Sequence, residues 1–296
     1  QIDLEAGRSF WSFQPIAQPS PPEVKQAAWP RNDVDRFILA RLEQEGLSPV
    51  GDADRATLIR RLYFDLIGLP PTPAEVDAFV ASEDKQAVEQ LVDRSLAMPQ
   101  FGERWGRHWL DIARFGESNG NVRNSTFPHA WRYRDYVIAA FNEDKPYDRF
   151  LTEQLAGDLL PFDSPEERNE NVIATGFLAI GSKPNAQGNP NFAMDIVADQ
   201  IEVTSLAMMG LTVGCARCHD HKYDPISMKD YYALAGIFAS TATLYGGGGN
   251  NMGGAPPTAL HVLDGQAAKA PEVVPMEINA KQKKLNKKQP APKYPA

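Results

Sequence analysis

Apolar stripes with helical spacing follow one another through residues 31 to about 240, and no convincing run of the alternating pattern typical of strands lies between them. The first stripe starts at Asn32 or Asp33 and stops at Gly46, and the second runs from Asp54 to a hard stop at Gly68. Next, Thr72-Pro-Ala-Glu supplies a cap, a proline at the first helical position and an acidic third residue. The pattern predicts a mainly α fold of many helices.

Further helices are expected over residues 86–97, 101–115, 130–141, 147–159, 170–179, 195–209 and 229–239. Glycines then dominate residues 246–254, and after Asp264 the composition turns to Lys, Ala, Gln and Pro. We therefore divide the chain into an N-terminal extended segment (1–30), a helical domain (31–245), and a Gly-rich loop with an irregular basic arm (246–296).

Composition excludes several classes of protein. With 43% hydrophobic residues, the 296-residue chain can bury a core, and its net charge of −8 argues against nucleic-acid binding. No stretch approaches the roughly 18 uninterrupted apolar residues of a transmembrane helix. The arm holds seven of the 30 basic residues, so we expect it to be solvated, with packing on the protein's own surface or on a neighbouring subunit as the alternatives.

Only two cysteines occur, and their spacing carries the chemistry. Cys215-Ala-Arg-Cys218-His219 has the form of a c-type haem attachment sequence. In such a sequence two thiols add across the porphyrin vinyl groups, and the adjacent histidine ligates the iron. The segment predicts one covalent haem c held by Cys215 and Cys218, with His219 as the proximal ligand.

Two other chemistries fit the same residue types. Zinc is one alternative, with Cys215, Cys218, His219 and His221 as ligands, although structural zinc sites usually draw on a second, distant ligand pair. A redox dithiol is the other, but it favours a strand followed by a helix, whereas residues 204–214 read as a helix that ends in a turn. Haem is therefore the preferred interpretation.

The sequence around the cysteines is similar to that of a known family. The resemblance is carried, in order along the chain, by segments 29–42, 65–73, 102–111, 131–138, 153–161, 210–226 and 230–238. Together they resemble the planctomycete cytochrome c-like domain family, exported haem c proteins that contain domains of unknown function. The resemblance covers about residues 10–245 and implies a mainly helical, haem-binding protein located outside the cytoplasm. Family members typically continue into a second domain, whereas this chain ends in the basic arm.

The sixth iron ligand decides between electron transfer and catalysis, because a filled site favours transfer and an open site admits small molecules. We predict His108, which we place on an aromatic helical face with Trp105 and Trp109. His261 is the second choice, and His129 a weaker one.

Electron transfer outside the cytoplasm, through a redox partner protein, is the function these residues favour. Arg217 is a candidate to pair with a haem propionate, since a buried carboxylate needs a charged donor. Two alternatives stay open: a peroxidase-like or oxidative haem enzyme, and a structural module stabilised by haem, with self-assembly through the C-terminal arm. No residue is assigned to catalysis.

Overall fold

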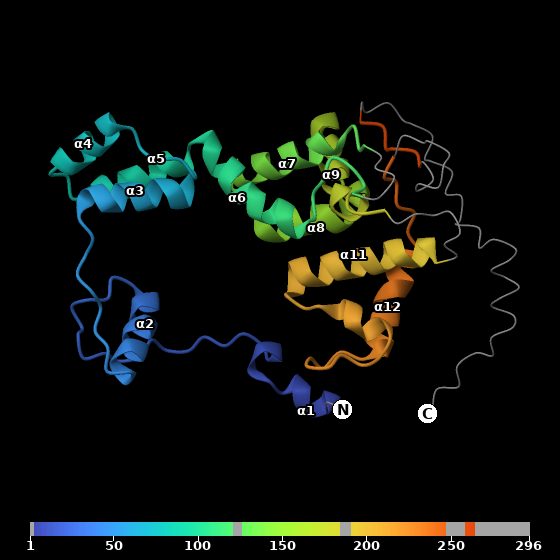
Figure 1. The fold of residues 1–296 in the computed structure, drawn as a ribbon, viewed down its shortest axis with the longest axis horizontal. Helices are drawn as coiled ribbons and strands as arrows, with labels where there is room; N and C mark the ends of the chain where they lie inside the picture. Colours follow the sequence, from blue (N-terminus) through green and yellow to red (C-terminus); the bar gives the residue numbers. More distant parts are fainter. Residues whose placement is uncertain (1–2, 121–125, 184–190, 247–257, 264–296) are drawn as a thin grey trace, which may run out of the picture.

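A computed structural model describes residues 3–120, 126–183, 191–246 and 258–263, and these are mainly helical, as the sequence predicts (Figure 1). The helices are α1 (Leu4–Arg8), η1 (Trp11–Phe13), α2 (Asp33–Gln44), α3 (Arg55–Leu66), α4 (Pro73–Ala81), α5 (Ala87–Leu96), α6 (Pro99–Ile112), α7 (Ala130–Asn142), α8 (Tyr147–Ala156), η2 (Gly157–Leu159), α9 (Pro165–Ala174), α10 (Gly176–Ala179), α11 (Phe192–Met209), η3 (Val213–Arg217) and α12 (Met228–Ala239). Within these ranges one isolated bridge, Ser118 to Thr126, is the sole extended pairing, and no helix is long and apolar enough to cross a membrane.

Side-chain caps fix several helix starts where the sequence signals them. Asn32 and Thr72 each form a reciprocal capping box, with Asp35 and Glu75 respectively. Asp54 accepts the amide of Thr57 and begins α3. These bonds satisfy amides that have no partner inside the helix, so the predicted starts of α2, α3 and α4 are confirmed.

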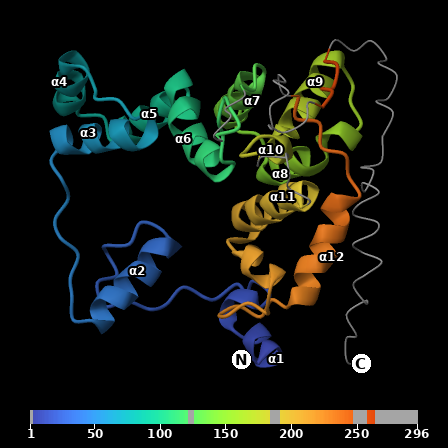
Figure 2. The same cartoon turned by 45° about the vertical axis from the view of Figure 1, so that its right-hand side comes forward.

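Three apolar clusters hold the helices together. The first joins α3, α4 and α5; the second and largest joins α6 through α11; the third joins α11, η3 and α12. Figures 1 and 2 both show α11 between the α7–α10 bundle and α12. α11 contributes Ile196 and Val203 to the largest cluster, and Val197 and Ile201 to the third. Two faces of one helix therefore serve two cores.

Glycine allows the close crossing of α6 and α7. A Cβ atom on Gly102 would lie 2.4 Å from the carbonyl oxygen of Ile138, and one on Gly106 would lie 3.4 Å from Val137. The side chain of Asn142 accepts the Gly102 amide at 2.8 Å. The two helices can pack this tightly only because position 102 has no side chain.

A buried carboxylate connects α7 and α8. Glu153 accepts hydrogen bonds from the Tyr136 hydroxyl (2.6 Å), the Lys145 ammonium (2.8 Å) and the Arg149 guanidinium (2.6 Å). Burial alone would raise the pKa of Glu153, but these donors outweigh it and hold the pKa below its ordinary value. Burial also strongly raises the pKa of Tyr136, so its hydroxyl remains a donor.

Two of the predicted apolar faces are wrong. The sequence predicts a stripe of Val34, Phe37, Ile38 and Leu42 along α2, but Val34, Phe37 and Ile38 are exposed, and Leu39 is the one residue of this helix that is buried. On α6, Trp109 is buried, whereas Trp105 is 39% exposed. The buried residues of α6 are Gly102, Gly106, Trp109 and Leu110, and the two glycines cannot be recognised in a pattern of apolar residues.

Helix boundaries also differ in places. Helix α9 begins at Pro165, with Ser164 as its cap, five residues before the predicted start. Helix α1, capped by Asp3, lies inside the segment predicted to be extended, and a Cβ on its Gly7 would lie 3.0 Å from Pro225. The backbone at Gly7 therefore lies close to Pro225, and α1 lies beside the loop that follows the two cysteines (Figures 1 and 2). The predicted arm beyond residue 263 lies outside the described residues.

Candidate functional site: the Cys-Ala-Arg-Cys-His segment

Cys215 lies in a short 3-10 helix that follows a sharp chain reversal, and Cys218 is the C-cap of that helix. Helix α11 ends at Gly210, whose φ of +67° is the left-handed conformation that glycine adopts freely. The chain then turns back as η3, which packs on α11 and α12 through Val213 and Ala216. Cys215 and Cys218 are both free and exposed. The alternation of buried and exposed residues therefore anchors the segment and presents its thiols.

Two carboxylates on α11 bind the two ends of this segment. Glu202 accepts the Gly214 amide at 2.8 Å, and Asp195 lies 3.2 Å from the Arg217 guanidinium. The carboxylates are seven residues apart, so they lie on one face of the helix. Sequence reasoning missed both as parts of the site. Their spacing is visible in the sequence, but their partners become apparent only once the chain has reversed.

The opposite side of the segment is held by α12 and its N-terminal residues. The Tyr232 hydroxyl donates to the Arg217 carbonyl at 3.1 Å. The Asp220 carboxylate accepts the amide of Met228, the first residue of α12, at 2.9 Å. Anions are favoured at a helix N-terminus, so this contact also fixes the loop that carries His219.

His219 is exposed, and one nitrogen of its ring is engaged. Its Nδ1 lies 2.7 Å from the backbone carbonyl of Asp220. A carbonyl only accepts, so Nδ1 carries the proton, and Nε2 is the basic nitrogen of the neutral ring. Histidines that ligate metals show the same arrangement, in which a carbonyl or carboxylate on one nitrogen orients the other.

His221 has a structural role. It is buried, its Nδ1 accepts the amide of Asp224 at 2.8 Å, and its Nε2 lies 3.5 Å from the Thr212 hydroxyl. An amide donor at Nδ1 requires the neutral tautomer with its proton on Nε2, so the 3.2 Å approach of the Asp224 carboxylate is not an ion pair. The ring closes the loop of residues 220–226.

Large side chains are exposed on the elements that carry and adjoin the cysteine segment. Leu206 and Met209 on α11, Tyr223 in the loop after η3, and Tyr232 on α12 are between 45% and 74% exposed. The hydroxyl of Tyr231 is buried and has no hydrogen-bond partner among the described residues. Exposed apolar side chains and an unsatisfied buried polar atom are both typical of a site that binds a further group. The residues present fit a haem at this position.

The described residues do not bring a set of zinc ligands together at this segment. Within the described ranges no group of three or more His, Cys, Asp or Glu side chains converges as a metal site requires. His221 points its nitrogens at Asp224 and Thr212, away from such a set. A four-ligand zinc site at this segment would require the loop to be rebuilt.

The other predicted site residues lie elsewhere. His108 is exposed on α6, with its ring edge against Trp105 at 5.5 Å between centroids. Helix α6 packs on α3, α7 and α11, whereas η3 packs on α11 and α12. His129 and His261 border one separate cavity, which is lined by residues of α7, α9 and α10 and by residues 244–246 and 260–263. The structure brings Cys215, Arg217, Cys218 and His219 together, and it brings His129 and His261 together.

Comparison with known proteins gives one result. A profile of PSCyt2, described as a protein of unknown function (DUF1549), matches residues 33–243. No curated protein and no solved structure shows significant similarity to the chain. Because the match spans well over half of the sequence, this protein belongs to the PSCyt2 family of unknown function.

Proposed function

We propose that this chain is a mono-haem c-type cytochrome domain that transfers electrons outside the cytoplasm. The observation that carries the proposal is the Cys215–His219 segment, with two free, exposed thiols and a histidine whose Nδ1 is held by a carbonyl. Cys215 and Cys218 would hold the haem covalently, and Nε2 of His219 would ligate the iron. When bound, the haem supplies a one-electron couple.

The residues around the segment keep it ready for attachment. Glu202 holds the amide next to Cys215, and Asp195 holds the side chain next to Cys218, so both thiols stay on the solvent side of η3. The guanidinium of Arg217 has five donors, so it can bind Asp195 and still meet a propionate at the rim. Covalent attachment takes place after export, which is why the proposal includes a location outside the cytoplasm.

The decisive experiment is expression of the full chain with a haem c maturation system. We expect the intact mass to exceed that of the polypeptide by one haem, and we expect acid-acetone to leave the colour with the protein. Replacing both Cys215 and Cys218 with alanine should abolish covalent incorporation, while far-ultraviolet circular dichroism shows an unchanged helical fold. A colourless protein, or one that contains zinc, would overturn the proposal.

The resting absorption spectrum separates the carrier from the haem enzyme. A low-spin, six-coordinate spectrum that cyanide does not change supports electron transfer. A high-spin spectrum that shifts with cyanide or peroxide supports an enzyme with an open iron position. The structural-module alternative is supported if haem raises the melting temperature but the iron exchanges no electrons with small mediators.

A further inference from the structure

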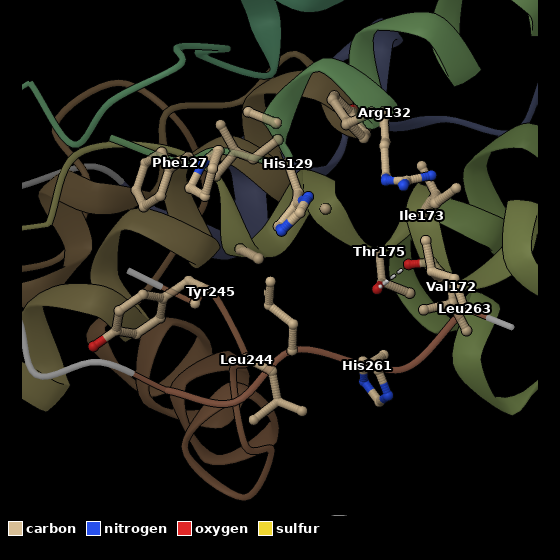
Figure 3. A pocket seen from close by; sticks show the side chains of 18 of the residues that line it. Phe127, His129, Arg132, Val172, Ile173, Thr175, Leu244, Tyr245, His261 and Leu263 are labelled. Atoms are coloured by element: carbon tan, nitrogen blue, oxygen red, sulfur yellow. Dashed lines mark hydrogen bonds between the residues drawn. The ribbon is translucent and has the colours of Figure 1, made fainter. Parts of the chain in front are cut away.

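A cavity of about 520 Å³ lies apart from the cysteine segment, at the other end of α12. Figure 3 shows Phe127, His129 and Arg132 along one side of it and Leu244, Tyr245 and His261 along the other. This volume is in the range of small-molecule sites. Most of its walls are apolar, and they also include Val172, Ile173, Ala179, Ile180, Leu260 and Leu263.

The wall contributed by residues 258–263 is fixed at both ends. The hydroxyl of Thr258 accepts the amides of Tyr245 (2.8 Å) and Gly246 (2.9 Å). Near its other end, the carbonyl of Val262 accepts a hydrogen bond from Arg168 at 3.0 Å. The cavity is therefore bounded by anchored chain on this side as well as by helices α7, α9 and α10.

The charge of the lining is opposite to that of the protein. The chain as a whole carries −8, yet the lining contributed by the described residues includes Arg132, His129 and His261 and, within that part of the chain, no carboxylate. The ammonium of Lys183 lies 5.9 Å from the ring centroid of Phe127 and 5.4 Å from that of Tyr245, two residues that line the cavity. Cationic groups along the described wall of a cavity favour an anion there.

Arg132 is the side chain best placed to bind an anion. Its guanidinium stacks on the Trp131 ring at 4.6 Å, and it takes part in none of the ion pairs formed among the described residues. Asp135, Glu143 and Glu170 border a smaller neighbouring cavity together with Arg132, and none of the three forms an ion pair with it among the described residues. A single guanidinium beside apolar walls matches one carboxylate on an apolar body.

We propose that this cavity binds a small amphipathic carboxylate, with Arg132 pairing the carboxylate and the apolar walls enclosing the rest of the molecule. The inference does not depend on haem binding, because no residue of the cysteine segment lines the cavity. The protein would thus carry a ligand site in addition to the site proposed for haem.

Calorimetric titration of the full chain with 2-naphthoate and with 2-naphthol tests this proposal. The two probes share an apolar body and differ in the carboxylate. We expect 2-naphthoate to bind more tightly, and we expect Arg132→Gln to weaken it about tenfold or more while leaving 2-naphthol unchanged. Arg134→Gln is the matched control, because Arg134 lies on the same helix, pairs with Glu117 and Asp135, and does not line the cavity.

A second variant tests the location. Ala179 lines the cavity, so Ala179→Phe should fill part of it and weaken both probes, while circular dichroism and the melting temperature report that the fold is kept. The proposal is overturned if neither probe binds, if the two bind equally well, or if Arg132→Gln and Ala179→Phe leave 2-naphthoate binding unchanged.

Discussion

Trp105 and Trp109 lie one turn apart on α6 in opposite surroundings, and replacing each with alanine gives a sharp test of the packing. Trp109 is 6% exposed, its ring centroid lies 4.8 Å from that of Phe150 and 5.7 Å from that of Phe177, and its Nε1 donates to the Tyr133 hydroxyl at 2.9 Å. Trp105 is 39% exposed and is flanked along its own helix by Phe101 and His108.

The expected costs follow from these contacts. Trp109→Ala removes a buried ring, leaves a cavity between three helices and deletes one buried hydrogen bond, so we expect a loss of about 4 kcal/mol in the free energy of unfolding. In a protein of this size that loss corresponds to a melting temperature lower by roughly 8–16 °C. Trp105→Ala removes a half-exposed ring and should cost about 1 kcal/mol.

Urea unfolding followed by circular dichroism at 222 nm measures both variants in the haem-free protein. Equal destabilisation by the two variants would refute the assignment of the buried face of α6. Repeating the measurement on the haem-loaded protein adds a second result: if haem packs on α6, as ligation by His108 would require, Trp105→Ala should cost more with haem than without it. An unchanged cost would remove α6 from the wall of the haem site.

Three further predictions test the fold and the site. Gly102→Ala should destabilise the protein by about 3 kcal/mol, because its Cβ would meet a backbone carbonyl of α7, whereas Gly236→Ala, which meets nothing within 4 Å in α12, should stabilise it by about 0.5–1 kcal/mol in the same urea titration. Glu153→Gln should lower the free energy of unfolding by about 3 kcal/mol at pH 7. The pKa of Glu153 in the folded protein lies below its ordinary value of 4.5, so the wild type is more stable than the variant above that pH. Unfolding curves should show this difference in stability shrink as the pH falls through the folded pKa. His108 lies on α6, whereas η3 packs on α11 and α12, so the choice of His108 as sixth ligand still rests on the sequence. If His108 ligates the iron of the haem-loaded protein, His108→Ala should turn a low-spin spectrum high-spin and keep the covalent haem, and His261→Ala should leave the spectrum unchanged. An unchanged low-spin spectrum in His108→Ala would exclude His108 as the ligand.

Local signals made the helices predictable, and the absence of a local signal explains the errors. Caps such as Asn32 and Thr72 act within one turn, so they can be recognised before the fold is known. Which face of a helix is buried depends on its neighbours. Helix α6 buries Gly102 and Gly106 against α7, and this face cannot be predicted from the spacing of apolar residues. The Ser164 cap of α9 and the Asp3 cap of α1 are local signals that the sequence-based prediction did not use.

For the candidate site, the sequence reveals the reactive groups and not their supports. The Cys215–His219 spacing is contiguous, so it can be recognised without a structure. Glu202 and Asp195 contact that segment only because the chain reverses at Gly210 and returns along α11. The cavity gathers residues from positions 127 to 263, and such convergence has no signature in the order of the chain.

Helix α11 is the element through which the two proposed sites can affect each other. Its Val197 and Ile201 pack under the cysteine segment, and its Ile196 and Val203 pack in the core whose far side forms the cavity. Interiors are close-packed and transmit strain, so a shift of α11 caused at one site must be accommodated at the other. If haem changes the position of α11, the carboxylate must bind the haem-loaded protein and the haem-free protein with different affinities. Titrating 2-naphthoate into the haem-free and haem-loaded proteins measures this coupling directly, and equal affinities would show that α11 holds the two sites independently.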